Sequence, residues 1–456
     1  MFDLKFHKIP GSVLILIVCA GYTQILNTFW FHDDWVFLAN AAGIEPRGGG
    51  LARWISYVGY WKLFWPAFGL ESVFWGVTRF LLHVLSSLLV MMIGRQVGLS
   101  RVGQLLSGFI FASGAVAFES LYWGTGAIEL LGGFFSLLAL WLWLTGRGFQ
   151  YLALVAAMLA ILSKESSLFL PAFFALHLMK SQRRDPLKIL GIATVVLFAV
   201  LAIFALRNDF GSSAEYALTL QAIPRNMLAL GFWLVAPPPF QRGLEWTQAW
   251  PLMVGALVWI SWIILALKEA RAGRWTIPVV LLMTGISMGP AALLSTHVLP
   301  RYDYLPTAGL AFTIGWVLDR RLRWVSARRE ILVAAVFAIL VGVSTYYRVH
   351  VTFTNGRPVH RLVVKEQTSQ RVCQGLEKLD LNPNDRLVFF IEPSTHPEEL
   401  KHLQDSVGGT LGPRLILGPN IKVTWSHEIT PEDIGAWIIS VDGLDLELLG
   451  KYNPRR

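Results

Sequence analysis

The segment AIELLGGFFSLLALWLWLT, residues 127–145, decides the fold class of this chain. Its one charged residue, Glu129, lies near the start, and most of the other residues are apolar. A helix that crosses the hydrocarbon core of a bilayer, about 30 Å thick, needs about 20 predominantly apolar residues. The segment therefore predicts a membrane-spanning helix.

Similar apolar runs recur along the chain. Two shorter runs, 151–163 and 166–179, flank the pair Lys164-Glu165, and a weaker candidate, 225–236, ends in three prolines. Repeated runs of this kind predict an all-α polytopic membrane protein. The remaining clear runs begin near Gly11, Ser72, Gly103, Lys188, Pro251, Ile277, Tyr304 and Ile331.

The composition agrees with that prediction. Of the 456 residues, 54% are hydrophobic and 15% are charged, whereas an average soluble protein is about 25% charged. These values exclude an ordinary soluble enzyme and a disordered chain. Cysteine usage excludes a disulfide scaffold, because the two cysteines are Cys19 in an apolar run and Cys373 in the polar tail.

Lys and Arg in short loops predict the orientation, because cytoplasmic loops are enriched in both. If the basic loops are cytoplasmic and 225–239 does not cross, about 11 transmembrane helices follow, with a cytoplasmic N-terminus. We expect the bacterial inner membrane as the location. The net charge of +9 then belongs to these loops, and no nucleic acid partner is expected. The basic loops contain Arg95 and Arg101, Arg147, and the ranges 180–188, 268–274 and 319–329.

The tail differs from the rest of the chain. It is polar, with a predicted helix over 359–379 and short apolar runs separated by Pro, Gly and Asn, which are typical of strands. We therefore expect a transmembrane domain over 1–350 and a small α/β domain over 351–456 on the external, periplasmic side. The strand-like runs are 387–391, 415–417, 421–425 and 437–441.

Ionisable residues beside the apolar runs gather at the predicted external face. A charge in a bilayer costs several kcal/mol unless it is paired, so such residues are candidate functional groups. Simpler explanations are helix caps for the acids, a local ion pair for Lys164-Glu165, and contact with lipid headgroups for the arginines. The candidates are Asp33, Asp34, Glu119, Glu129, Lys164, Glu165, Arg207, His297, Arg301 and Asp303.

The chemistry of these residues points to group transfer. Adjacent carboxylates such as Asp33 and Asp34 suit proton abstraction, since close like charges raise the pKa of one of them. Such a pair is also compatible with a divalent cation, although none is required. Arginines at the interface suit a phosphate at headgroup depth. A base and a phosphate site facing outward fit sugar transfer from a lipid-phosphate carrier.

Five short strings resemble a known family. Over residues 12–320, their order is similar to that of the GT-C glycosyltransferases, polytopic enzymes that use polyprenyl-phosphate sugars. The similarity is greatest to the membrane part of the tetratricopeptide-repeat O-mannosyltransferases and their bacterial relatives. The strings are Asp33-Asp34-Trp35 with Asn40, Arg79-Phe80-Leu81-Leu82-His83, the segment from Phe111 to Glu119, Ser163-Lys164-Glu165, and Arg301-Tyr302-Asp303-Tyr304-Leu305-Pro306.

The resemblance implies an inverting transfer from a polyprenyl-phosphate sugar to an external acceptor, which is a protein, a lipid or a glycan. It makes Asp33 the expected general base, with Asp34 orienting it or sharing its proton. No metal ligand is assigned, and no tetratricopeptide repeat follows to indicate the acceptor. The residues expected to bind the donor phosphate are Lys164, Arg207 and Arg301, and those expected to position substrate are Glu165, Tyr302, Tyr304, Glu119 and His297.

Two other functions fit the same composition. A transporter or flippase for lipid-linked sugars also needs arginines for phosphate, but it predicts charges deep in several helices and internal repeats. In this sequence the charges gather at one face and no repeat is visible. A polymerase or ligase of surface glycans is also a transferase, but it uses lipid-diphosphate donors.

Overall fold

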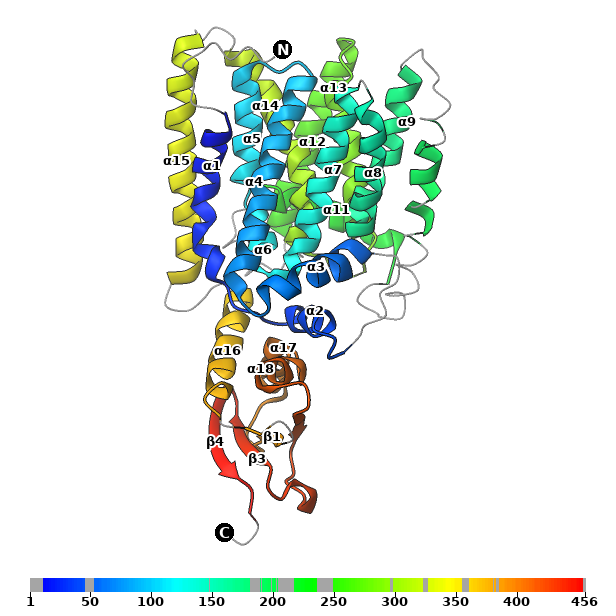
Figure 1. The fold of residues 1–456 in the computed structure, drawn as a ribbon. Coiled ribbons are helices and arrows are strands. Elements are labelled where there is room, and N and C mark those ends of the chain that lie inside the picture. Colours follow the sequence, from blue (N-terminus) through cyan, green and yellow to red (C-terminus); the bar gives the residue numbers. More distant parts are fainter. Residues whose placement is uncertain are drawn as a thin grey trace.

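The computed structural model has two parts, a bundle of helices and a smaller α/β unit at one end of it (Figure 1). A layer of short helices lies between them. The structure describes residues 11–45, 53–146, 148–180, 217–235, 249–295, 298–322, 327–354, 361–379, 381–382 and 385–453, together with 189, 191–197, 199–201 and 203.

The bundle helices run roughly along one common direction (Figure 1). In chain order the larger ones are α1 Gly11–Cys19, α4 Ser72–Gln96, α5 Arg101–Ala112, α7 Ala127–Thr145, α8 Phe149–Ser163, α9 Leu170–Lys180, α11 Ile223–Trp233, α12 Ala249–Arg271, α13 Thr276–Ala292, α14 Tyr304–Leu322 and α15 Ala327–Thr354.

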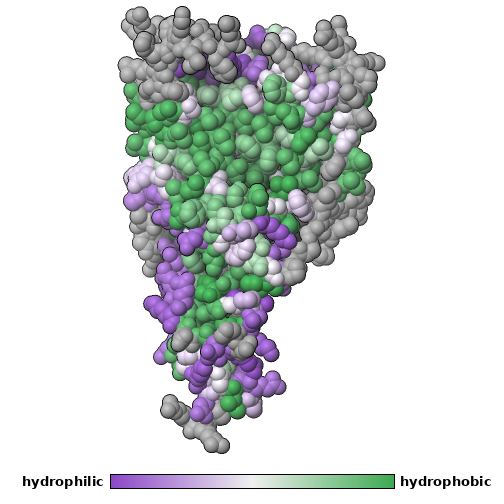
Figure 2. Space-filling view, viewed as in Figure 1, coloured by the Kyte–Doolittle hydropathy of each residue, from purple (hydrophilic) through white to green (hydrophobic). Residues whose placement is uncertain are grey.

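Among the described residues, three helices are long and apolar enough to cross a membrane, namely Ser72–Gln96, Gly124–Thr145 and Ala249–Arg271. The visible face of the bundle carries a broad band of apolar side chains, with polar ones towards both ends (Figure 2). On α12, for example, Met253 and Leu257 are 65% and 62% exposed, which suits contact with lipid rather than water. The chain is thus a helical membrane protein with a small additional unit, and the figure of about 11 spans remains a prediction.

Small residues bring neighbouring helices close together. A Cβ added at Gly342 of α15 would lie 2.7 Å from the carbonyl oxygen of Ile17 in α1, and one at Gly255 of α12 would lie 1.9 Å from that of Leu228 in α11. Within a membrane, where apolar burial gives little drive for association, such close backbone contact stabilises helix pairs.

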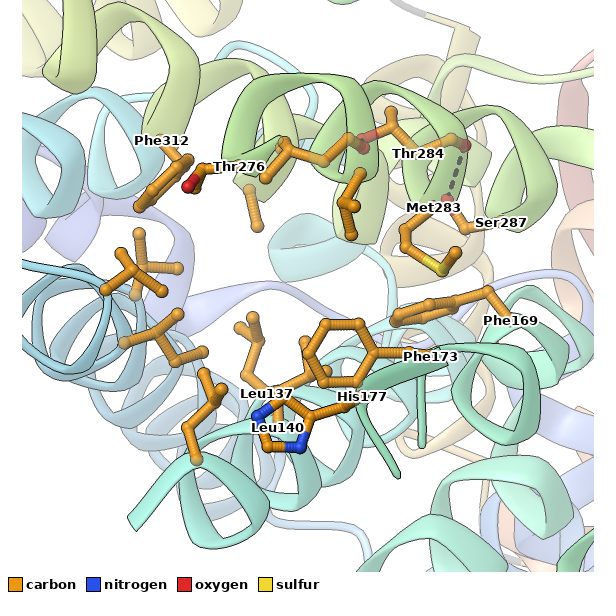
Figure 3. A pocket seen from close by; sticks show the side chains of 18 of the residues that line it. Leu137, Leu140, Phe169, Phe173, His177, Thr276, Met283, Thr284, Ser287 and Phe312 are labelled. Carbon is orange, nitrogen blue, oxygen red and sulfur yellow. Dashed lines mark hydrogen bonds between the residues drawn. The ribbon is translucent and has the colours of Figure 1, made fainter. Parts of the chain in front are cut away.

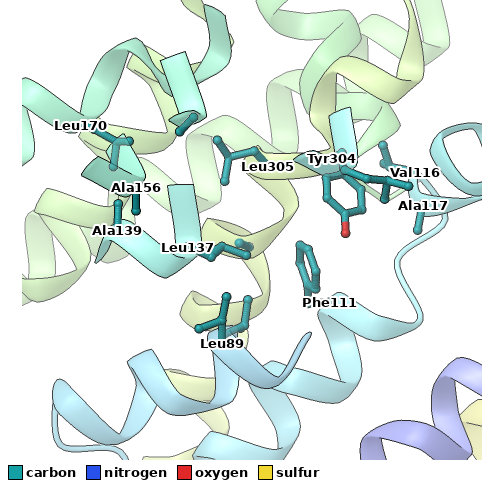
Figure 4. Close-up of a cluster of buried hydrophobic side chains, with 14 of the residues drawn as sticks. Leu89, Phe111, Val116, Ala117, Leu137, Ala139, Ala156, Leu170, Tyr304 and Leu305 are labelled. Carbon is teal, nitrogen blue, oxygen red and sulfur yellow. The ribbon is translucent and has the colours of Figure 1, made fainter. Parts of the chain in front are cut away.

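The centre of the bundle is apolar and rich in aromatic rings. Tyr304, at the start of α14, packs among Phe111 and Leu137 (Figure 4). Its hydroxyl lies 2.9 Å from Nδ1 of His83, and Nε2 of His83 lies 3.0 Å from the carbonyl oxygen of Ala112. Both nitrogens of this buried imidazole therefore have partners, and the two side chains join α4, α5 and α14.

Short helices cover the end of the bundle that faces the α/β unit. A buried aromatic cluster joins this layer to the bundle: Trp30 before α2, Trp61 of α3 and Trp75 of α4 have ring centroids 4.9–6.1 Å apart. This layer positions the candidate site, because each functional loop described below enters or leaves it. The short helices are η1 Ala20–Asn27, α2 Asp33–Ala41, η2 Ile55–Gly59, α3 Tyr60–Phe68, α6 Ala117–Tyr122, η3 Gly124–Gly126, η4 Glu165–Phe169 and η8 Pro300–Asp303.

The α/β unit contains a four-stranded sheet in the order β2-β1-β3-β4. Strand β1 pairs in parallel with β2 and β3, and β4 returns antiparallel to β3. Buried side chains of α16 and α17 pack with those of the sheet in one core. The elements are α16 Arg361–Leu376, β1 Arg386–Ile391, α17 Pro397–Val407, α18 Leu411–Leu417, β2 Lys422–Ser426, β3 Trp437–Asp442 and β4 Asp445–Lys451.

Three of the four predicted strand runs lie in strands, and the predicted helix over 359–379 corresponds to α16. The prediction for 415–417 is wrong, because these residues end helix α18. An apolar run of three residues has no periodicity that separates strand from helix. Here Leu415 and Ile416 pack against the aromatic cluster, and that tertiary contact favours the helix.

Candidate functional site

Four loops meet at the end of the bundle nearest the α/β unit, and a buried lysine lies where they converge. The Nζ of Lys164 lies 2.8 Å from Oε1 of Glu129 and 3.2 Å from Oε1 of Glu165. The side chains of Lys164 and Glu129 are each 4% exposed. Burying a charge without a partner is costly, and these two ion pairs offset that cost for Lys164.

A second cation reaches this cluster from the first loop. Arg53 donates from Nε and Nη2 to the two carboxylate oxygens of Glu165, at 2.9 and 2.6 Å, and from Nη1 to the hydroxyl of Tyr57 at 2.6 Å. Its φ of 55° is unusual for a residue with a side chain, and such backbone strain persists only where surrounding contacts hold it. The bidentate pair supplies those contacts.

Aromatic rings separate Lys164 from a third cation, Arg301. The Nζ of Lys164 lies 4.5 Å from the ring centroid of Tyr302, and Cζ of Arg301 lies 4.4 Å from that of Trp123 and 5.5 Å from that of Tyr302. Nη1 of Arg301 is buried and has no hydrogen-bond partner among the described residues. A guanidinium that stacks on rings and keeps a donor free is suited to an oxyanion.

The two adjacent aspartates have different surroundings. Asp34 is fully buried; its Oδ1 accepts from the backbone N and the hydroxyl of Thr125, both at 2.7 Å, and its Oδ2 accepts from the backbone N of Phe31 at 3.4 Å. A Cβ at Gly124 would lie 2.8 Å from Oδ1, so only glycine allows this close approach. Burial raises the pKa of Asp34 to about 6, although the Thr125 hydroxyl and Arg79 lower it.

Asp33, by contrast, opens towards a cleft. Its side chain is 48% exposed, and its Oδ1 lies 3.0 Å from Nδ1 of His32. The φ of His32 is 57°, a second positive value for a residue with a side chain. This turn points the two carboxylates in different directions, so that Asp34 is engaged by the protein while Asp33 remains accessible to a ligand.

A further buried carboxyl belongs to the same short helix as Arg301, two residues later in the chain. Asp303 is fully buried, and neither of its side-chain oxygens has a hydrogen-bond partner in the described part of the chain. Burial, and then the negative charge of Glu129, raise the pKa of Asp303 well above its ordinary value. The surroundings of Asp303 therefore favour its neutral form.

The structure brings several of the predicted site residues together. Lys164, Glu165, Arg301 and Tyr302 form one cluster, and Glu119 and Asp33 lie close enough to interact with the charge of Arg301. Tyr304 lies apart, with its hydroxyl on His83 in the core, because the helical phase of α14 turns it inward. Two of the predicted residues, Arg207 and His297, lie outside the described residues.

Sequence reasoning did not assign Arg53, Trp123 or Arg79 to the site. Arg79 is buried in α4 and donates to the carbonyl oxygen of Leu121 at 3.0 Å and to the hydroxyl of Thr28 at 3.1 Å. Two signals were present: Arg53 is a basic residue in a predicted external loop, and Arg79 is a charge inside an apolar run. Trp123 follows one of the five strings, but its pattern does not distinguish it from the other 18 tryptophans as a contact of Arg301.

An apolar cavity of about 510 Å³ lies within the bundle (Figure 3). Leu305, four residues after Arg301, and Phe169, four residues after Glu165, line it, and so do Gly273, Trp275 and Thr276 around the start of α13, whereas no member of the charged cluster does. Most of the lining is aliphatic or aromatic, with few polar groups such as His177. A cavity of this shape and chemistry fits a flexible hydrocarbon chain.

The described residues contain no group of three or more His, Cys, Asp or Glu side chains arranged to hold a metal ion. The acidic pair is a poor fit to a cation, because donors of Thr125 and Phe31 occupy the oxygens of Asp34.

Comparisons with known proteins give little guidance on identity. No family model matches the sequence, and no curated protein matches it. Among solved structures, the chain is similar to a crystal structure of the Archaeoglobus fulgidus oligosaccharyltransferase tethered with an acceptor peptide, at 12% identity and a TM-score of 0.47. The similarity covers 91% of this chain and 63% of that one, so the chain spans less than two thirds of that protein. A likeness of this size assigns neither family nor activity.

Proposed function

We propose that this protein is an integral-membrane glycosyltransferase of GT-C type. It transfers a sugar from a polyprenyl-phosphate donor to an acceptor at the external, periplasmic face of the bacterial inner membrane. The observation that carries the proposal is the environment of Arg301, whose buried Nη1 has no hydrogen-bond partner among the described residues. Its Cζ lies 5.5 Å from the ring centroid of Tyr302, the ring that Nζ of Lys164 approaches to 4.5 Å.

The cations account for the phosphate of the donor. Glu129 and Glu165 neutralise Lys164 and Arg53 in the resting site, whereas Arg301 stacks on rings and retains a donor. As the bond between the sugar carbon and the phosphate oxygen breaks, negative charge grows on the phosphate. A positioned guanidinium stabilises that growing charge most where water is excluded. Arg301 and Lys164 therefore bind the leaving group.

Asp33 is the general base, on the side of the sugar opposite to the leaving phosphate. Its carboxylate takes the proton of the acceptor hydroxyl while the hydroxyl oxygen forms a bond to the anomeric carbon, and lipid phosphate leaves with the electron pair. Attack opposite the leaving group inverts the anomeric centre. Asp34 holds the loop through Thr125 and so orients Asp33, because its own oxygens already accept protein hydrogen bonds.

The cavity accounts for the lipid part of the donor. The phosphate of a polyprenyl carrier stays at headgroup depth while the hydrocarbon chain lies in the bilayer. The described cavity suits the hydrocarbon part, because its lining is mostly apolar, and two lining residues, Leu305 and Phe169, each follow a member of the charged cluster by four residues. A transporter would need the same groups, but it would not need an accessible base beside them.

The proposal is tested by incubating the purified protein with a panel of polyprenyl-phosphate sugars and measuring lipid phosphate release. We expect release by the wild type and a loss of about 100-fold or more in Asp33→Asn, in the range for removal of a general base. Asp34→Asn should lose activity mainly through a lower amount of folded protein.

Equal release per folded molecule by the wild type and Asp33→Asn would refute the assignment of the base. Movement of intact donor across a vesicle membrane, with no cleavage of any donor in the panel, would replace the transferase with a flippase. Cleavage of lipid-diphosphate donors alone would instead indicate a polymerase or ligase of surface glycans.

A further inference from the structure

The α/β unit is fixed against the loop that carries Asp33. The indole N–H of Trp35 lies 3.2 Å from both the hydroxyl of Ser369 and the carbonyl oxygen of Ser406, and the backbone N of His32 donates to the same carbonyl at 3.0 Å. Gly408 has a φ of +65°, and a Cβ there would lie 2.5 Å from Cβ of Trp35. This junction has the close packing of a protein interior, so the unit has a defined position relative to Asp33.

A cleft of about 400 Å³ lies at the same junction. Residues from both parts of the chain form its walls, and Asp33 is one of them. The lining residues are His32, Asp33 and Val36 from the loop and helix α2, and Gln404, Asp405, Gly408, Gly409 and Trp425 from the α/β unit. The cleft is therefore incomplete without the α/β unit.

The wall opposite Asp33 combines one aromatic ring with short polar side chains. One face of Trp425 is covered by Phe389, since the two rings stack with centroids 4.2 Å apart. The partly exposed indole can thus meet a ligand in the cleft with its other face or its edge. Asp405 supplies hydroxyl acceptors, and the amide of Gln404 supplies both a donor and an acceptor.

This combination matches the surface of a sugar ring. A pyranose has an apolar face of C–H groups, which packs on an indole, and a rim of hydroxyls that pair with carboxylates and amides. Charge also selects the ligand: Asp33 and Asp405 both line the cleft and flank His32, at 3.0 and 4.0 Å. Lys365 lies 3.1 Å from Asp405 and so partly neutralises it. A neutral, hydroxyl-rich group is favoured over an acidic one.

We propose that this cleft is the acceptor subsite and that its ligand is a carbohydrate, one of whose hydroxyls reaches Asp33. The inference rests on the proposed function, and it narrows the acceptor to a glycan or the sugar part of a glycolipid. It also gives the α/β unit a role in binding, because Trp425, Gln404 and Asp405 all belong to it.

The test measures sugar binding without any donor. Full-length protein in lipid nanodiscs is mixed with methyl glycosides of glucose, mannose, galactose and N-acetylglucosamine, and with a serine- and threonine-containing peptide, and contacts are followed by saturation-transfer NMR. We expect at least one glycoside to bind and binding to weaken about tenfold in Trp425→Ala. Gln404→Ala and Asp405→Asn should weaken it as well.

Matched controls lie in the same unit. Gln374 and Asp445 are exposed and away from the cleft lining, so Gln374→Ala and Asp445→Asn should bind the glycoside as the wild type does. The polar variants Gln404→Ala and Asp405→Asn keep the test informative if Trp425→Ala does not fold.

The outcomes separate this inference from the proposed function. No glycoside binding, equal binding by wild type and the three cleft variants, or binding of the peptide alone would each overturn the carbohydrate subsite, even if donor cleavage is observed. If the wild type cleaves no donor, the proposed transferase activity is overturned. Sugar binding that depends on the cleft residues would in that case identify a sugar-binding site with a different function.

Discussion

Two clusters of acidic and basic side chains in the described part of the bundle are built differently. At the far end of α14 from Arg301, the carboxylate of Glu269 accepts from Arg274 at 2.7 and 3.0 Å and from Arg320 at 2.8 and 2.9 Å. Both carboxylate oxygens are paired twice, and the two arginines are 44% and 31% exposed. This inner cluster ties the ends of α12 and α14 together and leaves no room for a ligand on its acid.

The outer cluster, formed by Arg53, Glu129, Lys164, Glu165 and Arg301, differs from the inner one in burial and in the partners of its cations. Its ion pairs are more deeply buried, and one cation is held by rings instead of acids. Stability alone would favour a carboxylate beside Arg301, or an apolar side chain in its place. Arg301 thus differs from the arginines of the inner cluster in the kind of partner it has, and not in the number of ion pairs nearby.

The largest expected effect is a difference in activity between a variant of the outer cluster and a variant of the inner cluster. Replacement of the outer arginine, Arg301→Ala, should lower lipid phosphate release by about 100-fold or more, as expected for the loss of a donor to a developing oxyanion. Arg274→Ala, the matched inner variant, should keep turnover per folded molecule within about twofold, because water can replace a half-exposed arginine. Release is measured per mole of folded protein. Similar losses in both variants would end the distinction.

A second prediction concerns stability. Glu129→Gln leaves Lys164 buried with only part of its compensating charge, which should cost about 3 kcal/mol in the free energy of unfolding. Glu269→Gln should cost about 1 kcal/mol, since the arginines that it leaves are partly hydrated. Denaturation midpoints in the same detergent give both values. A larger cost at Glu269 would show that the inner cluster carries more of the stability.

A third prediction uses pH at the outer end. The pKa of Asp34 is about 6 in the folded chain, above its value of about 3.9 in an unfolded one. The folded state therefore binds more protons between these values, so this group makes the protein less stable as pH rises from about 4 to 6. The full effect is at most about 3 kcal/mol.

The matching variant removes this titration. The stability of wild type minus that of Asp34→Asn should fall as pH rises from 4 to 6 and then level off, whereas the exposed carboxylate variant Asp445→Asn should show no such step. Thermal midpoints across the pH range give the difference. A difference that grows with pH would mean that the fold favours the ionised form of Asp34.

The smallest expected effect is on salt dependence. Double-mutant cycles of Glu269 with Arg274 should give a coupling below about 1 kcal/mol that decreases between low and high salt. The coupling between Glu165 and Arg53 should stay the same from low to high salt, because the two side chains are only 14% and 11% exposed. Equal salt sensitivity in the two cycles would place the outer cluster in contact with bulk solvent.

Much of the fold follows from hydropathy. The segment 127–145 is helix α7, and three of the four strand-like runs lie in the sheet. A long continuous apolar run, or a short one between turn residues, is compatible with few other secondary structures. The gathering of charges at one end was also predictable, since each candidate lies at the boundary of an apolar run. Hydropathy does not give the pairing among them, which depends on how four loops far apart in sequence converge.

Three features of the site needed the structure. The difference between Asp33 and Asp34 depends on Thr125, which is 91 residues away from Asp34. The placement of Tyr304 in the core depends on where helix α14 begins, and a shift by one residue would change the direction of its side chain by about 100°. Arg53 follows glycines at 48–50. This stretch has no regular spacing of apolar residues that would predict which way the side chain of Arg53 points.

The junction at Trp35 has a consequence for the timing of synthesis. Trp35 leaves the ribosome early, but its partners Ser369 and Ser406 follow 334 and 371 residues later. A growing chain therefore displays Asp33 long before the wall that carries Gln404 and Trp425 exists. The cleft is completed only by the last quarter of the chain, even when the helices of the bundle have already assembled.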